Sequence, residues 1–513
     1  MALVQLLEKL PSNSLSLFLI FSFLFFLYKW LYATPATNKN QPPSPRKLPV
    51  FGNLHQLGKL PHRSLRALSQ QYGDLMLLHV GSKPTIVASS ADTAREIMKT
   101  HDVVFANRPN LKVARRFLYD GKDLVFASYG EYWRQMKSIC VLHVLSSKKV
   151  RSFREVREEE AAVMVDKIRR FRQSSEEVNL SEIIASLTKD VICRVAFGRK
   201  YTGEEGCANI RELLSDFSEV VVAFCMQDSV PWLGWIDRLS GVDRKANRVA
   251  NVLDEFIEKI VQEHVDRLNL QTDNTDEADK GEKLQDFVDT LLELQRENSS
   301  VLPRESIKAI LMDMLAAGTD TTYTLLEWAM VELFKHPLVM KELQEEVRVS
   351  SRGKQGVDED DVKNMKYLKA VIKETLRLHP PFPLLVFRES SQDVKINGYD
   401  IAAGTQVIIN AWAIQRDTSF WEDAEEFRPE RFLNSSIDFK GQDFEFIPFG
   451  AGRRGCPGMS FGIVGAELVL ATLAYAFDWK LPQGKDFNVV ENMGITIRKR
   501  DPLVAIPTPY SRN

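Results

Sequence analysis

Apolar residues recur three and four positions apart through most of the chain from about residue 60 onward. This spacing is typical of amphipathic helices, and it is clearest in four segments, 151–171, 249–268, 307–337 and 459–477. Runs of alternating or β-branched residues predict a few short strands joined by turns that contain glycine. These runs lie at 75–90, 394–401 and 405–414. We therefore expect a fold that is mainly α with small β-sheets.

An apolar run near the N-terminus has a different pattern. Residues 15–32, LSLFLIFSFLFFLYKWLY, contain one charged side chain, Lys29. As a helix this run would be about 27 Å long, close to the thickness of the bilayer hydrocarbon. A cleaved signal peptide is the alternative, but its apolar region is usually shorter, and no clean small-residue cleavage pattern follows the run. We expect one N-terminal transmembrane helix.

The residues that follow this run carry positive charge without acidic neighbours. Lys29, Lys39, Arg46 and Lys47 all precede the next acidic residue, Asp74. The positive-inside rule then directs the remainder of the chain to the cytosol. Prolines at 35, 42, 43, 45 and 49 favour a stiff, extended connection. The predicted organisation is an N-terminal lumenal segment 1–14, a transmembrane signal anchor 15–32, a proline-rich hinge 33–50 and a cytosolic body 51–513.

Charge and cysteine content exclude several classes of function. Lysine and arginine together number 67 and aspartate and glutamate 69, so the chain lacks the basic excess that nucleic-acid binding requires. The five cysteines are odd in number and have no spacing typical of a disulfide framework or a zinc site. A reducing, cytosol-facing environment and a chain that binds no nucleic acid fit these observations best.

Cys456 lies in a segment that packs poorly, IPFGAGRRGCPG at 447–458. If a helix follows, Pro457 can take the first helical position, and a thiolate would then face free backbone N–H groups and the positive end of the helix dipole. The dipole alone would lower a thiol pKa only from about 8.5 to about 7. Full ionisation needs a metal. Iron in a porphyrin suits this loop, because Arg454 could pair with a propionate.

The same loop resembles that of a known family. FGAGRRGCPG, residues 449–458, matches the haem-binding motif F-x-x-G-x-R-x-C-x-G of the cytochrome P450 superfamily, with Phe449, Gly452, Arg454, Cys456 and Gly458 in register. A glycine-rich turn with an incidental cysteine is the alternative. The resemblance implies the cytochrome P450 fold, with Cys456 as the axial thiolate ligand of haem iron and with Phe449, Arg454 and Gly458 at the cofactor.

A second match joins three charged residues. Glu374 and Arg377 lie in KETLRLHP, and Arg431 lies in FRPERF, before the cysteine loop. The spacing of the first two is not distinctive, because it recurs at Glu345–Arg348 and Glu425–Arg428. The order of the segments resembles the family, which implies a buried structural triad of Glu374, Arg377 and Arg431. Removing one member of such a set is costly.

A third match is AAGTDTT, residues 316–322, in the long helical segment after Pro303. Gly318 weakens a helix by about 1 kcal/mol relative to alanine, so a packing or ligand reason is expected there. Threonine and aspartate can divert backbone hydrogen bonds and open a local bulge. The resemblance implies that Asp320 and Thr321 help water deliver protons to iron-bound dioxygen. The alternative is a capping cluster that begins another helix.

Weaker matches extend the predicted site. Trp133 matches a tryptophan near a haem propionate, Lys137 stands where arginine is usual, and Arg388 matches a propionate-binding arginine. Lysine keeps the charge but loses the bidentate fork of arginine. The resemblance also predicts a substrate pocket that includes an apolar wall. Its residues are Ala317, Phe382, Leu384, Leu385, Val386, Phe387, which replaces a common proline, and Gly494.

The resemblance covers essentially the whole chain and is nearest to plant microsomal (class II) members of the family numbered 71. It implies a haem-thiolate monooxygenase that inserts one oxygen atom of O2 into a small lipophilic metabolite such as a terpenoid, a phenolic or coumarin, or an alkaloid. Haem b would be the cofactor, and NADPH-cytochrome P450 reductase would supply electrons, with Arg453, Lys148 and Lys149 as candidate docking cations. The chain would be a single-pass protein of the endoplasmic reticulum membrane.

Two other functions remain open from the sequence. One is a haem-thiolate isomerase or dehydratase, which would rearrange an oxygenated substrate without O2. The presence of Asp320 and Thr321 argues against this function, because such enzymes have less need of a proton relay. A membrane-anchored haem sensor is the alternative from another class, and the chain shows no appended signalling segment that would favour it.

Overall fold

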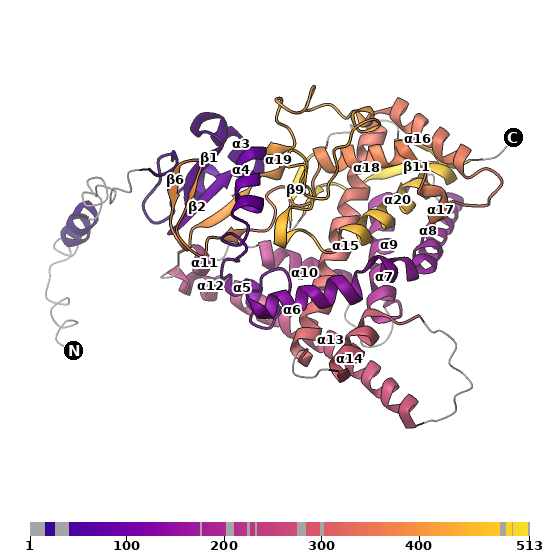
Figure 1. Ribbon diagram of the computed structural model, residues 1–513, viewed down its shortest axis with the longest axis horizontal. Helices are drawn as coiled ribbons and strands as arrows, with labels where there is room; N and C mark the ends of the chain where they lie inside the picture. Colours follow the sequence, from indigo (N-terminus) through magenta and orange to yellow (C-terminus); the bar gives the residue numbers. More distant parts are fainter. Residues whose placement is uncertain are drawn as a thin grey trace.

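A long helix, α15 (Arg304–Lys335), crosses the middle of the body, and Figure 1 shows α9 (Leu180–Phe197), α18 (Lys366–Leu378) and α20 (Met459–Ala476) beside it. The computed structural model describes residues 16–25, 40–174, 177–201, 210–222, 226–230, 233–273, 284–297, 302–482, 489–494 and 496–510.

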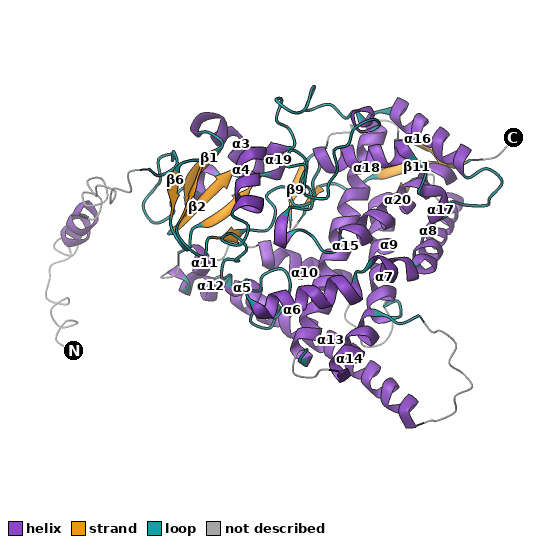
Figure 2. Ribbon diagram, viewed as in Figure 1, coloured by secondary structure: helices purple, strands orange, loops and turns teal. Residues whose placement is uncertain are grey.

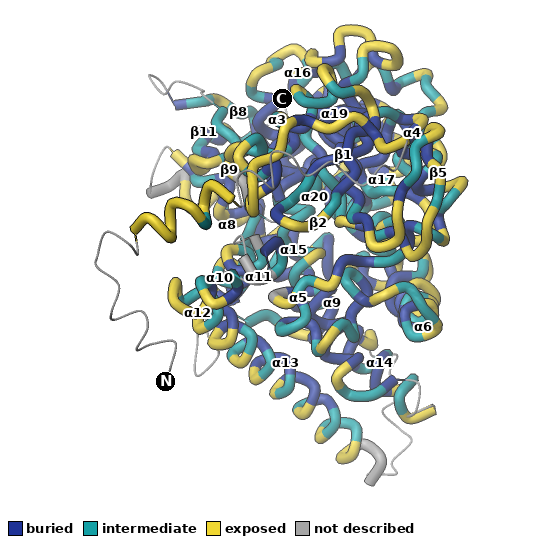
Figure 3. The backbone as a smooth tube through the Cα atoms, turned by 90° about the vertical axis from the view of Figure 1, so that its left-hand side faces the viewer, coloured by how far each residue is buried: buried dark blue, intermediate teal, exposed yellow. Residues whose placement is uncertain are grey.

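Other α-helices of the described body, 40–510 with its gaps, surround this centre. In chain order they are α3 (Pro61–Tyr72), α4 (Ala91–Arg95), α5 (Lys112–Phe117), α6 (Glu131–Ile139), α7 (Ser147–Ser152), α8 (Arg154–Ser174), α10 (Ile210–Val222), α11 (Met226–Ser229), α12 (Trp235–Leu239), α13 (Val242–Asp273), α14 (Phe287–Glu297), α16 (Pro337–Ser350), α17 (Glu359–Val362) and α19 (Ala411–Ile414). Figure 3 shows exposed positions recurring along α13, as expected for an amphipathic helix whose other side packs on the body.

The strands form small sheets, and the largest lies at one end of the body (Figure 2). Its order is β1-β2-β7-β4, with β2 and β7 parallel and the other pairs antiparallel. A three-stranded sheet has the order β3-β11-β8, and β5-β6 and β9-β10 are hairpins. The strands are β1 (Leu75–Val80), β2 (Lys83–Ala88), β3 (Val178–Asn179), β4 (Arg388–Glu389), β5 (Val394–Ile396), β6 (Tyr399–Ile401), β7 (Gln406–Ile409), β8 (Phe477–Lys480), β9 (Glu491–Met493), β10 (Ile497–Lys499) and β11 (Val504–Pro509).

These elements confirm the mainly helical fold with small sheets. One strand expectation was wrong: residues 405–414 do not form a single strand, because β7 ends at Ile409 and α19 follows at once. Asn410 ends the strand by capping that helix, since its side chain accepts a hydrogen bond from the Ala413 amide at 3.1 Å.

One central helix, α9, has no clear amphipathic stripe in the sequence. Twelve of its 18 residues are buried, three of them polar, so the helix is enclosed by the body on most sides. Its ends nevertheless carry signals. Asn179 caps the start by accepting from the Glu182 amide at 3.2 Å, and Gly198 ends the helix in the left-handed region at φ 74°.

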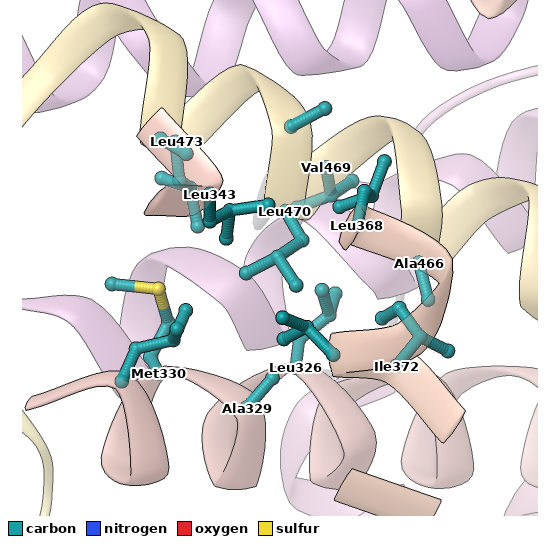
Figure 4. Packing of buried hydrophobic residues seen from close by; sticks show 14 of the residues in the cluster. Leu326, Ala329, Met330, Leu343, Leu368, Ile372, Ala466, Val469, Leu470 and Leu473 are labelled. Atoms are coloured by element: carbon teal, nitrogen blue, oxygen red, sulfur yellow. The ribbon is translucent and has the colours of Figure 1, made fainter. Parts of the chain in front are cut away.

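The largest hydrophobic core lies where α15, α16, α18 and α20 meet (Figure 4). Residues one turn apart, such as Leu326 and Met330 of α15 or Leu368 and Ile372 of α18, point into it. Helix α20 is packed into this core over much of its surface. The helix that carries the end of the cysteine loop is therefore fixed by packing along most of its length.

The N-terminal prediction is tested only in part. Residues 16–25 form a helix, Ser16–Phe25, whose large apolar side chains are exposed, while 1–15 and 26–39 lie outside the described residues. The anchor over 15–32 therefore stays a prediction. Among the helices that the structure describes, only Met459–Ala476 is long and apolar enough to cross a membrane, and more than half of it is buried in the core.

The described part of the predicted hinge is bound to the body. The Leu77 amide donates to the Pro43 carbonyl at 2.9 Å, and the Asp400 amide donates to the Asn40 carbonyl at 2.8 Å. Asn53 binds the same segment from the other side, through the Pro45 carbonyl at 3.3 Å. Residues 40–47 therefore lie against β1 and β6, and the hinge predicted over 33–50 stays a prediction.

Candidate functional site

The cysteine loop is held by close backbone contacts. The Cys456 amide donates to the Phe449 carbonyl at 3.0 Å, and a short 3-10 turn, Gly452–Arg454, closes the loop. Gly452 has φ 68°, and a Cβ there would lie 2.2 Å from the Met98 carbonyl oxygen. Only glycine fits this position, so the loop geometry depends on it.

The helix after the loop begins later than expected. The N-cap of α20 is Gly458, and its carbonyl accepts from the Gly462 amide at 3.0 Å. Pro457 therefore precedes the cap and does not take the first helical position, which corrects the prediction from sequence. The amides of Gly458 and Met459 nevertheless stabilise the Cys456 thiolate, as expected for a sulfur at a helix start.

Burial outweighs those amides at Cys456. The side chain is exposed, yet protein surrounds the sulfur closely enough that burial raises the pKa of the thiol, while the Gly458 amide, Lys137 and the Met459 amide oppose it. Coordination to a metal would deprotonate the thiol outright.

Three buried arginines gather beside this loop. Arg108, Arg388 and Arg454 are each less than 10% exposed. Burial lowers the pKa of all three, and the mutual repulsion of the guanidinium groups lowers those of Arg108 and Arg454 further. The pKa values of Arg388 and Arg454 fall to about 10. Among the described carboxylates, only Asp102 pairs with one of them, Arg388, at 3.4 Å.

This surplus of buried positive charge favours an anionic ligand. A porphyrin carries two propionates, so the donor set fits haem on the side of the cysteine loop. Arg108 was not identified from the sequence. Its role depends on neighbours at 388 and 454, hundreds of residues away, and FANRPN at 105–110 carries no local signal of them.

Arg454 and Trp133 pack together as predicted neighbours of the cofactor. The Arg454 guanidinium lies 4.1 Å from the centre of the Trp133 ring and donates to the Ala106 carbonyl at 2.7 Å. Trp133 donates its indole N–H to the Leu124 carbonyl at 3.0 Å. The ammonium group of Lys137 lies 5.1 Å from the centre of the Trp133 ring and donates a hydrogen bond to the Arg453 carbonyl. Burial lowers the pKa of Lys137, and its ammonium group is directed at the cysteine loop.

The 316–322 segment lies inside one uninterrupted helix. Helix α15 continues from Arg304 to Lys335, which excludes the alternative that the threonines begin a new helix. The Thr321 hydroxyl donates to the Ala317 carbonyl at 2.8 Å, but the helix stays regular across this segment, so the expectation of a local bulge was wrong. Ala317 is exposed although most of α15 is buried. This part of α15 therefore borders open space within the protein.

Gly318 has a packing reason. A Cβ at this position would lie 2.5 Å from Cδ1 of Ile192, on α9. Glycine therefore lets α9 and α15 approach each other, which offsets its low helix propensity.

Asp320 is bound by the hairpin β9–β10. The Thr496 hydroxyl donates to Asp320 Oδ2 at 2.7 Å, and Arg498 forms an ion pair with Oδ1. Neither partner was identified from the sequence, because both lie more than 170 residues away along the chain.

The three charged residues of the predicted triad meet in the interior. Glu374 accepts from Arg377 through both oxygens, at 2.8 Å each, and from Arg431 at 3.0 Å. Arg377 also donates to backbone carbonyls of Gln415 and Ala424, at 3.0 and 2.7 Å. The arrangement fixes the segments before the cysteine loop.

The predicted pocket wall and the C-terminal hairpin lie together. The Ile497 amide donates to the Pro381 carbonyl at 3.1 Å, which places the start of β10 beside the start of residues 382–387. Arg108 fixes the far end of that wall by donating to the Val386 and Phe387 carbonyls, at 2.7 and 2.6 Å. The remaining wall residues, Phe382, Leu384 and Leu385, are half-buried.

A surface hollow of about 340 Å³ borders the cysteine loop at Arg453. It combines cations with apolar side chains and is lined by Tyr129, Trp133, Arg134, Lys137, Ser138, Val141, Leu142 and Arg453. Of the predicted docking cations, Arg453 lines it. Lys149 instead donates to the Gln285 carbonyl at 2.8 Å, outside the hollow.

Comparison with known proteins agrees with this geometry. The cytochrome P450 family profile matches residues 42–505. Cytochrome P450 71A6 of Nepeta racemosa is 52% identical over 503 residues, covering 95% of this chain and 98% of the relative. Cytochrome P450 71A22 of Arabidopsis thaliana is 51% identical, covering 96% and 97%. Norfluorocurarine oxidase of a Strychnos species is 49% identical, covering 95% and 96%.

Proposed function

The chain belongs to the cytochrome P450 family as a plant class II monooxygenase of the family-71 type, and we propose that it oxygenates a small lipophilic specialised metabolite. The observation that carries the proposal is the buried cationic cluster of Arg108, Arg388 and Arg454 beside the Cys456 loop. Such a cluster is costly without an anionic ligand. The reaction would insert one oxygen atom of O2 and reduce the other to water.

In this proposal the cofactor is haem b. Cys456 would hold the iron through its thiolate, and Arg108, Arg388 and Arg454 would pair with the propionates, with Trp133 and Lys137 beside them. Phe449 and Gly458 shape the loop around the sulfur: a Cβ at Gly458 would lie 4.0 Å from Sγ. Thiolate-ligated haem supplies the activation of O2 toward O–O cleavage.

Asp320 and Thr321, on α15, would handle the protons of the reaction. Both lie on the part of α15 that borders open space, next to the exposed Ala317. The Thr321 hydroxyl is already polarised by its bond to the Ala317 carbonyl and can orient water. Asp320 can accept a proton from solvent and pass it on, because a carboxylate within reach of water can serve as a general acid and base.

The substrate is lipophilic because its pocket wall is apolar. Phe382, Leu384, Leu385, Val386 and Phe387 offer no charged side chain, so recognition rests on shape and apolar area. One relative is named for the oxidation of norfluorocurarine. Terpenoids, phenolics or coumarins, and alkaloids are the classes we propose for this chain.

The electron donor is NADPH-cytochrome P450 reductase, docking over the hollow that contains Arg134, Lys137 and Arg453. Charge complementarity favours an acidic partner surface there. The exposed helix Ser16–Phe25 supports a single-pass anchor in the endoplasmic reticulum membrane, with the body in the cytosol.

Isotope labelling tests the reaction. The chain, reconstituted in microsomes with the reductase and NADPH, is given a panel of lipophilic metabolites under 18O2. We expect a product that carries one 18O atom and forms only with the reductase. A product that forms without O2 or electrons would instead establish the isomerase or dehydratase, and haem binding without turnover of any compound would favour a sensor.

A further inference from the structure

The C-terminal hairpin β9–β10 contacts α15 at Asp320. Thr496 Oγ1 donates to Asp320 Oδ2 at 2.7 Å, and Arg498 pairs with Oδ1. The hydroxyl of Thr324, which also lies on α15, is 2.9 Å from the Thr496 hydroxyl. Both oxygens of Asp320 are therefore committed to one hairpin.

The same hairpin is fixed to the pocket wall and to the helical core. The Trp328 indole donates to the Ile497 carbonyl at 2.8 Å, and the Ile497 amide donates to the Pro381 carbonyl at 3.1 Å. Its other strand is held by Glu491, which pairs with Arg63 at 2.8 Å. The hairpin therefore links the pocket wall at Pro381 to Asp320 through a short series of hydrogen bonds.

We infer that Arg498 is a positioning residue for Asp320, which orients its carboxylate and links proton delivery to the hairpin that borders the substrate. The inference rests on the proposed role of Asp320. The Asp320 side chain is only 15% exposed, and a carboxylate so placed requires a cation or several donors. Arg498 supplies the cation, with its guanidinium also 3.3 Å from the Thr496 hydroxyl.

Arg498 is itself held in place. Its guanidinium lies 5.4 Å from the centre of the Tyr323 ring, on the same face of α15 as Asp320. The side chain is half-buried, so solvent screens the ion pair only partly. Without Arg498, the carboxylate keeps one hydroxyl donor and gains freedom to rotate away from its proton-delivering orientation.

Uncoupled oxygen consumption tests this role. When protons are delivered wrongly, O2 takes two electrons and two protons and leaves as H2O2, so product per O2 consumed falls. We expect Arg498→Gln to lower the product formed per O2 consumed by about threefold to tenfold, which is less than the effect of losing a general acid. The variant should also show a larger solvent isotope effect in D2O. Arg498→Lys keeps the charge and should recover part of the ratio.

Arg500→Gln is the matched control, because Arg500 follows the same strand and is exposed, with a pair to Asp501 at 3.3 Å. It should behave as the wild type. If Arg498→Gln and Arg500→Gln gave the same product ratio and isotope effect, the inference would be overturned.

A measurement independent of turnover separates this inference from the proposed function. In a double-variant cycle on thermal unfolding of the haem-loaded protein, Arg498→Gln and Asp320→Asn should together destabilise less than the sum of the single variants. Additive losses would overturn the contact, whatever the activity. Coupled losses in a protein that oxygenates no compound would support the contact and refute the proposed function.

Discussion

Replacing Glu374 with glutamine should strongly destabilise the chain. Its carboxylate accepts from Arg377 Nε and Nη2 at 2.8 Å, from the Arg428 amide at 2.9 Å and from Arg431 Nε at 3.0 Å. The side chains of Glu374 and Arg377 have no exposed area, and that of Arg431 is 7% exposed. Glutamine keeps the shape but leaves two buried guanidinium groups without a counter-charge.

The magnitude follows from the burial. Breaking a buried ion pair by removing one partner costs about 3–5 kcal/mol, against a total folding stability of about 5–15 kcal/mol. Arg377 also holds the carbonyls of Gln415, Ala424 and Glu426, so the loss should spread to the segments before the cysteine loop. We therefore expect less haem to be retained as well.

Urea unfolding followed by tryptophan fluorescence, with haem content measured in parallel, checks this expectation. Glu345→Gln is the control, because Glu345 lies on the adjacent helix α16, is 67% exposed and pairs with Lys341 only at 3.7 Å. Its effect should stay within about 0.5 kcal/mol. A loss below about 1 kcal/mol for Glu374→Gln, or equal losses for both variants, would refute the reasoning from burial.

Two further predictions concern α15. Burial and the nearby carboxylate of Asp123 raise the pKa of Asp313 well above its usual range. Folding therefore favours the protonated form of Asp313. Its contribution to stability is present at low pH and is lost as the pH rises toward the raised pKa. Asp313→Asn, which keeps an acceptor for the Leu124 amide, should therefore melt higher than wild type at pH 8, with a difference that shrinks toward pH 4; an equal difference at both values would contradict this. Gly318→Ala should destabilise the protein by about 1–3 kcal/mol through a clash with Ile192. Adding Ile192→Val, which removes the clashing methyl group, should restore part of the lost melting temperature. No restoration would exclude the clash as the cause.

The sequence was most informative where chemistry is local. The loop around Cys456 holds the predicted ligand, two cations and several glycines within ten residues, so the prediction of a metal-binding thiolate needs only short-range spacing. The amphipathic helices were also predictable, because their periodicity reports which side is buried. Helix α9 was not, since it is buried on most sides and polar residues occur among its buried positions.

Long-range charge pairing could not be read from spacing. Glu374–Arg377 and Glu345–Arg348 have the same spacing, yet the first pair meets in the core and Arg348 instead pairs with Asp478 at 2.7 Å. The difference arises from tertiary packing, which places α18 in the interior. Tertiary packing also sets the contacts of Arg108 and Arg498. Arg108 binds the Val386 carbonyl, 278 residues away, and Arg498 binds Asp320 on α15.

The ligation of haem by Cys456 is the central claim, and the carbon monoxide difference spectrum of the reduced protein tests it most directly. The wild type should show the strongly red-shifted Soret band of thiolate-ligated haem, and Cys456→Ala should lack it. A band typical of histidine-ligated haem in the wild type, or a red-shifted band that survives in Cys456→Ala, would contradict the account.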